Sequence, residues 1–167
     1  MMLDRPIAAG AFGSSARESF MQIAASERLI AQGVLLSRTD EVIELGLPGT
    51  DYRLHLKIDE PISVATGKTI RGHLHARARR VDTTSGGGRY IEPVYGRPRR
   101  LQGRVVCVDA QANTIGVQCG CPFICVLGAG QEAASFAAGD FVTFDVERGA
   151  RFEAQAMPSN PAGTVAS

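Results

Sequence analysis

Histidines alternate with basic residues in two segments of the chain, and this spacing could build a charged surface. The first segment contains Arg53, His55 and Lys57, and the second contains Arg71, His73, His75, Arg77 and Arg79. Side chains two residues apart in a β-strand point to the same side of the sheet, so each segment would present its basic groups on one face. If the two strands are antiparallel neighbours, one face carries all of them. Like charges on neighbouring strands repel, so such a face requires a bound polyanion, carboxylates from elsewhere or solvent ions to balance it.

A polyanion is the first ligand that this surface could bind. Arginine forms bidentate contacts with phosphate, and sites for single-stranded nucleic acid combine a cationic groove with aromatic side chains on which bases stack. The predicted anion-binding set is Arg53, Lys57, Arg71, His73, His75, Arg77, Arg79, Tyr90 and Tyr95. The predicted partner is single-stranded nucleic acid or an acidic protein. Replacing Arg71, Arg77 and Arg79 together with Glu should abolish anion affinity and leave the fold intact.

A zinc site is an alternative use of the same histidines. His73 and His75 would project from one side of a strand, and His55 could approach from the neighbouring strand. Three imidazoles with an open fourth position form a geometry of hydrolytic zinc sites, with Glu44 as a further candidate ligand. The surrounding guanidinium groups would repel a divalent cation, and carboxylates that would orient the histidines are not evident. The turn after residue 47 could instead bring Glu44 near Arg53 or His55 as a compensating charge.

Four cysteines form a second candidate metal site. Cys119, Cys121 and Cys125 follow one another closely, with Cys107 upstream, and superficially resemble a metal knuckle. The odd positions between 115 and 127 are apolar, however, and the three cysteines share that parity. Free cysteine behaves as a small buried hydrophobe, so the pattern predicts reduced thiols in the core and no cofactor. A zinc or iron–sulfur centre is the alternative.

Catalytic motifs are missing from the sequence. It contains no Gly-x-Ser-x-Gly elbow, no phosphate-binding loop and no His-Glu-x-x-His pair. Asp145 and Glu147 share the polar side of a strand and could perform acid–base work, but no nucleophile accompanies them. The sequence therefore predicts a non-catalytic binding module. A structural or oligomerisation domain without a small ligand is the alternative, and a homo-oligomer is compatible with either.

Period-2 alternation predicts the elements that must position these residues. Expected strands cover 41–47, 52–58, 70–79, 101–108, 114–117, 123–127 and 141–146, with a short piece around Phe152. About eight short antiparallel strands with Gly-rich turns favour a small barrel or sandwich, OB-like or SH3-like. The sequence leaves open whether this region is one barrel or two small sheets. The predicted core contains Leu45, Leu54, Leu56, Ile70, Leu74, Val105, Val117, Phe123, Val142 and Phe144.

One amphipathic helix is expected before the strands. Ser15 and Glu18 form a capping box, and Gly33 supplies a stop signal, which together predict a helix within 14–33. The expected organisation is a flexible arm at 1–13, this helix, a β-domain at 34–155 and a disordered tail at 156–167.

Composition places the chain among ordinary globular domains. It has 167 residues, 44% of them hydrophobic, and a formal net charge of +1, which argues against disorder and disulfide-dense scaffolds. No apolar run is long enough for a membrane span, and no secretory signal is evident, so a cytoplasmic protein is expected. The neutral total hides an asymmetry: residues 68–104 hold ten basic and two acidic side chains, a net charge of +8. Such asymmetry favours an anion-facing region.

Overall fold

The computed structural model describes residues 27–155, and this range is built mainly from β-strands. The elements are β1 (Ile30–Arg38), β2 (Val42–Gly46), β3 (Arg53–Lys57), β4 (Thr69–Thr83), β5 (Tyr90–Glu92), β6 (Tyr95–Gly96), β7 (Arg100–Asp109), β8 (Thr114–Gln118), β9 (Pro122–Val126), the 3-10 helix η1 (Ala133–Ser135), β10 (Phe141–Val146) and β11 (Arg151–Ala154). Every segment expected to be a strand is confirmed as one. The strands β1, β5 and β6 were not expected.

The eleven strands form one mixed sheet whose hydrogen bonding returns to β4 twice. One circuit runs from β4 through β1, β2, β3 and β11 back to β4, and we call it the first circuit. The second circuit runs from β4 through β10, β7, β8 and β9. The expectation of a single small antiparallel barrel was therefore wrong in strand number and in direction, because β9 lies parallel to β4 and β11 lies parallel to β3.

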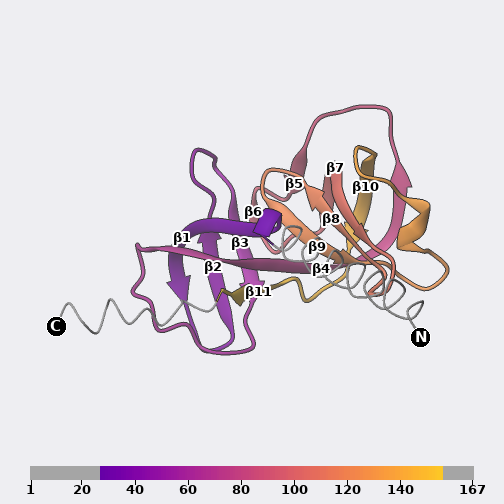
Figure 1. Cartoon of the computed structure of the whole chain (residues 1–167). Helices are drawn as coiled ribbons and strands as arrows, with labels where there is room; N and C mark the ends of the chain where they lie inside the picture. Colours follow the sequence, from indigo (N-terminus) through magenta and orange to yellow (C-terminus); the bar gives the residue numbers. More distant parts are fainter. Residues whose placement is uncertain (1–26, 156–167) are drawn as a thin grey trace, which may run out of the picture.

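The length of β4 explains how one strand can serve both circuits. It has 15 residues, whereas strands in globular proteins usually have about 3–10. Its first part pairs with β1 and β11, and its second part pairs with β9 and β10. Figure 1 shows β4 crossing the molecule between the two groups of strands.

The predicted helix at 14–33 is wrong in its last part, because β1 begins at Ile30. Ala31, Gly33 and Leu35 are buried at alternate positions, which is the pattern of a strand with one face in the core. Gly33 does not end a helix. It lies in a strand that packs closely against Leu45, because a Cβ on Gly33 would lie 2.7 Å from Leu45 Cγ. The first part of that helix with its capping box, the arm at 1–13 and the tail at 156–167 lie outside the described residues.

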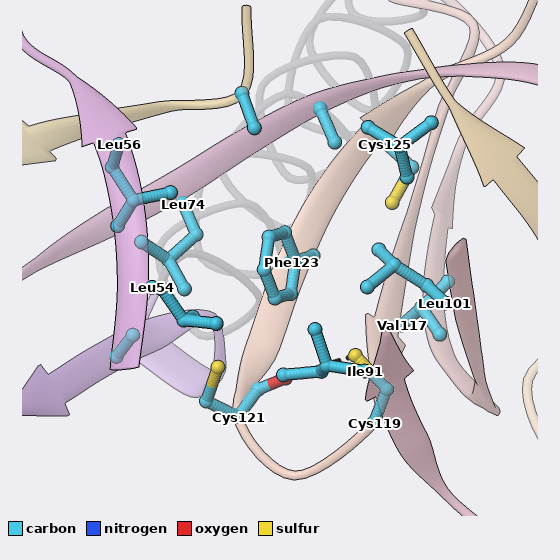
Figure 2. Close-up of a cluster of buried hydrophobic side chains, with 14 of the residues drawn as sticks. Leu54, Leu56, Leu74, Ile91, Leu101, Val117, Cys119, Cys121, Phe123 and Cys125 are labelled. Atoms are coloured by element: carbon cyan, nitrogen blue, oxygen red, sulfur yellow. Dashed lines mark hydrogen bonds between the residues drawn. The ribbon is translucent and has the colours of Figure 1, made fainter. Parts of the chain in front are cut away.

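The core runs without interruption through both circuits. All ten predicted core residues are buried, and they belong to one cluster. Figure 2 shows Phe123 of β9 between Leu54, Leu56 and Leu74 on one side and Leu101 and Val117 on the other. Within residues 27–155, no helix is long and apolar enough to cross a membrane.

Candidate anion-binding face

The predicted alternation places the basic residues of both strands on the outside of the sheet. In β3, Leu54 and Leu56 are fully buried while Arg53 and Lys57 are exposed. In β4, the apolar side chains between Ile70 and Ala78 are buried, and the intervening arginines are exposed. Sequence parity thus predicts the orientation of these side chains correctly.

The two strands are nevertheless not neighbours, and this part of the prediction was wrong. The C-terminal strand β11 lies between them, and Arg151 pairs with Lys57 of β3 on one side and with His75 of β4 on the other. The alternation within β3 and β4 carries no information about this insertion, because β11 comes from a distant part of the chain. The single face with all eight basic side chains therefore divides into two surfaces.

On β4, carboxylates from later parts of the chain compensate part of the charge. Glu153 of β11 lies 3.0 Å from His75 Nε2 and 4.0 Å from His73 Nδ1. Burial lowers the pKa of His75, and the hydrogen bond with Glu153 partly opposes this shift. The same hydrogen bond lowers the pKa of Glu153. Arg77 forms an ion pair with Glu147 at 3.6 Å. Within residues 27–155, no carboxylate lies at ion-pair distance from Arg71 or Arg79, so the compensation covers the middle of the strand.

On β3, the histidine has a carboxylate and the flanking cations do not. Glu44 of β2 faces His55, and the two side chains approach to 3.6 Å, as the hairpin argument predicted. The Oε2 atom of Glu44 is buried without a hydrogen-bond partner. Within residues 27–155, no carboxylate lies at ion-pair distance from Arg53 or Lys57.

An exposed aromatic ring completes the surface on β3. Tyr95 of β6 pairs with Arg53 in parallel register and is 58% exposed. Its ring meets the His55 ring edge-on at 5.1 Å between centroids, and the guanidinium of Arg53 lies 5.9 Å from its centroid. The backbone N–H of Arg53 donates a 2.8 Å hydrogen bond to Val94, which fixes the register.

The structure separates the remaining members of the predicted set. Tyr90 lies on β5, which pairs with β7 beside Gln102, away from Tyr95. Arg79 lies further along β4, past the residues that pair with β11 and β9. Arg71 lies at the other end of β4, opposite Gln32 of β1. Within residues 27–155, four of the nine predicted residues are cations with no carboxylate at ion-pair distance, namely Arg53, Lys57, Arg71 and Arg79. Among these four, Arg53 lies beside an exposed aromatic ring, that of Tyr95.

The candidate metal ligands do not assemble in the described part of the chain. Between residues 27 and 155, no three His, Cys, Asp or Glu side chains form a group that could hold a metal ion. His55 belongs to β3 and is separated from His73 and His75 by β11. The surface carboxylates of Asp145 and Glu147 are engaged with Arg100 at 2.7 Å and Arg77 at 3.6 Å.

The cysteines pack as the parity of the sequence predicts. Cys119, Cys121 and Cys125 are buried free thiols, and Cys107 is half-buried and also free. Burial raises the pKa of Cys119 to about 12 and that of Cys121 and Cys125 well above the ordinary value. Figure 2 shows these three side chains among the leucines and Phe123 of the core.

Two residues that matter for this surface were missed in the sequence. Glu153 alternates with Phe152 in the short last strand, so its outward position could have been inferred, although its neighbours could not. Gly46 lies opposite both Val34 and Arg53, and the Leu36 side chain packs against it.

No protein-family model, curated protein or solved structure matches the chain.

Proposed function

We propose that the chain is a non-catalytic binding module that takes single-stranded nucleic acid on the outer surface of β3. We call this surface, made by Arg53, His55 and Lys57 of β3 with Tyr95 of β6, the β3 face. The observation that carries the proposal is the ring of Tyr95, which is 58% exposed and lies beside the guanidinium of Arg53. Exposed aromatic rings next to cations are the platforms on which unpaired bases stack.

The charges of the β3 face support this ligand. Arg53 and Lys57 have no carboxylate partner in the range 27–155, so their charge is available to phosphates. Lys57 is four positions after Arg53 along the strand, a distance of roughly 13 Å, which allows two separate contacts to a sugar–phosphate backbone. Arg71 and Arg79 of β4 could extend the contact at greater distance.

The strand circuits support the proposal by analogy alone. We infer that each circuit is a small five-stranded barrel. OB folds are five-stranded barrels that bind oligonucleotides on the outer face of their central strands. In the first circuit β3 has a strand on each side, β2 and β11, so its outer face is a sheet surface of the kind that OB folds use.

Fluorescence anisotropy with a labelled short oligothymidylate tests the proposal. Wild type should bind, and the affinity should fall as sodium chloride rises. The variant Tyr95→Ala should lose about 1–3 kcal/mol of binding free energy because the stacking surface is gone. Tyr95→Phe keeps the ring and should bind like wild type.

Absence of oligonucleotide binding by wild type would overturn the proposal. So would equal affinities for wild type and Tyr95→Ala. Salt-dependent binding of polyglutamate without binding of oligonucleotide would indicate that this surface binds an acidic protein instead of nucleic acid.

A further inference from the structure

A hollow lies directly beside the β3 face, on the side of Arg53 away from Tyr95. Its volume is about 410 Å³, and Val34, Leu36, Gly46 and the turn at 47–53 line it. This volume is near the lower end of the roughly 300–1,000 Å³ typical of small-molecule sites. Residues 34, 46, 53 and 95 pair in succession across β1, β2, β3 and β6. The hollow and the Tyr95 ring therefore lie on the same surface, on opposite sides of Arg53.

Gly46 contributes backbone to the lining of this hollow, and the Leu36 side chain packs against it. Val34 is half-buried, and Leu36 is 39% exposed. A Cβ on Gly46 would lie 3.0 Å from Leu36 Cδ1 and 3.3 Å from its Cγ, so the leucine covers the glycine. The exposed part of the Leu36 side chain gives the hollow an aliphatic surface for one face of a planar ring.

Two charged side chains at the hollow, those of Asp51 and Arg53, favour ligand groups of opposite charge. The turn satisfies most of its own polar groups: the Thr50 hydroxyl donates to the Leu47 carbonyl at 2.8 Å and accepts from the N–H of Tyr52 at 3.1 Å. Asp51 and Arg53 have no carboxylate or cation partner in the described residues. The guanidinium attracts phosphate, and the Asp51 carboxylate repels it and accepts hydrogen bonds from ring N–H and amino groups.

We propose that the hollow is a nucleobase subsite with a preference for guanine, an inference that rests on the proposed function. One base stacks on Tyr95, the adjoining phosphate contacts Arg53, and the next base packs against Leu36 with its polar edge toward Asp51. Carboxylates recognise bases through amino groups. Guanine presents two adjacent donors, N1–H and the amino group, to the two oxygens of Asp51, whereas thymine and uracil present one N–H.

The preference is measured by comparing an oligothymidylate with an alternating guanine–thymine oligonucleotide of equal length. Wild type should bind the alternating strand about tenfold more tightly, because a bidentate contact contributes roughly 1–3 kcal/mol of discrimination. The variant Asp51→Ala should lose that preference and keep its affinity for oligothymidylate. Gly46→Val should also lose the preference, because its side chain displaces Leu36 from this position.

Gly86→Ala is the matched control, since nothing lies within 4 Å of a Cβ placed there. It should keep both affinities, and circular dichroism should show that all variants fold. Equal binding of the two strands by wild type, or a preference that survives in Asp51→Ala, would overturn the subsite. In that case Tyr95-dependent binding of oligothymidylate would still support the proposed function. A wild type that binds neither strand would overturn both.

Discussion

The outer surfaces of β3 and β4 have the same pattern of alternating arginine and histidine, yet they differ in the charge that they present. On β4, Glu153 contacts both His73 and His75, and Glu147 contacts Arg77. On β3, the cations flanking His55 have no carboxylate within the described residues, and an exposed tyrosine lies beside Arg53. The difference shows that the neighbouring segments decide which cations and histidines of a basic strand are paired with carboxylates.

The pairing of β11 explains the asymmetry. It pairs with β4 over four residue pairs but with β3 through one pair, Arg151 with Lys57. Glu153 comes two residues after Arg151, the one residue of β11 that pairs with β3. Glu153 therefore pairs with His73 of β4 and has no partner on β3. The other partner of β3 at the level of Arg53 is β6, which contributes Tyr95.

The substitution Gly72→Ala should give the largest effect, by separating β11 from β4. A Cβ on Gly72 would collide with the backbone oxygen of Glu153 and lie 2.6 Å from Phe152 Cζ. Overpacking of this kind costs about 3 kcal/mol or more when backbone must move. Urea unfolding followed by circular dichroism should show this loss of stability.

Gly46→Ala is the matched control for this prediction. Its added methyl meets the flexible end of Leu36 at 3.0 Å, so the change in unfolding free energy should stay below about 1 kcal/mol. If Gly72→Ala were as stable as wild type, β11 could not lie as close to β4 as the structure shows, and the neutralisation of β4 by Glu153 would lose its basis.

Two charge-matched double variants compare the surfaces directly. Arg53→Gln with Lys57→Gln removes two unpaired cations, and Arg77→Gln with Arg80→Gln removes two cations that are paired with Glu147 and Asp82. Two lost phosphate contacts should reduce the slope of log affinity against log salt by about 1.4 for a single strand. The β3 variant should show this change and weaken oligothymidylate binding about tenfold or more.

The Arg77/Arg80 variant should keep the slope, with an affinity within about threefold of wild type. Because the two variants lose the same net charge, general attraction to a polyanion changes equally in both. Equal losses would mean that the protein attracts anions through its total charge and that the β3 face has no special role.

The side on which each residue lies could be predicted from the sequence, because that depends on the local period of two. This is why the core residues and the outward histidines were predictable. The approach of Glu44 to His55 was predictable from the short turn that joins their two strands. The same local pattern was ambiguous at Ala31, Gly33 and Leu35, where helix signals upstream outweighed three alternating small or apolar residues. Tertiary pairing with β2 and β4 makes this segment a strand.

The neighbours of each strand could not be predicted, because they depend on contacts between distant segments. Glu153 is 78 residues from His75, and alternation within either strand says nothing about that contact. Tyr90 and Tyr95 are close in sequence but lie on strands that pair with β7 and β3 respectively. The hollow at Gly46 likewise depends on Leu36 of β1 as its wall.

The smallest expected effect is on the pKa of His75. Measuring it distinguishes the effect of burial from the effect of nearby charges on the β4 surface. Burial lowers the pKa of His75 below its usual 6.5, Glu153 raises it, and Arg151 and His73 lower it. Glu153→Gln should therefore lower this pKa further, and Arg151→Gln should raise it. The NMR shift of the His75 Cε1 proton against pH measures both changes.

Stability should follow the same histidine as pH falls. The unfolded chain binds a proton at His75 near pH 6.5 while the folded chain resists it, so the free energy of unfolding should decrease from pH 6.5 downward until His75 titrates in the folded state. His75→Gln should flatten this decrease, an effect below about 1 kcal/mol for a partly exposed group. Glu153, whose pKa is also lowered, adds a separate loss only below its ordinary value near 4.5. A His75 pKa that moved in the same direction in both variants would show that burial changes accompany the substitutions and that Glu153 does not neutralise β4 by direct contact.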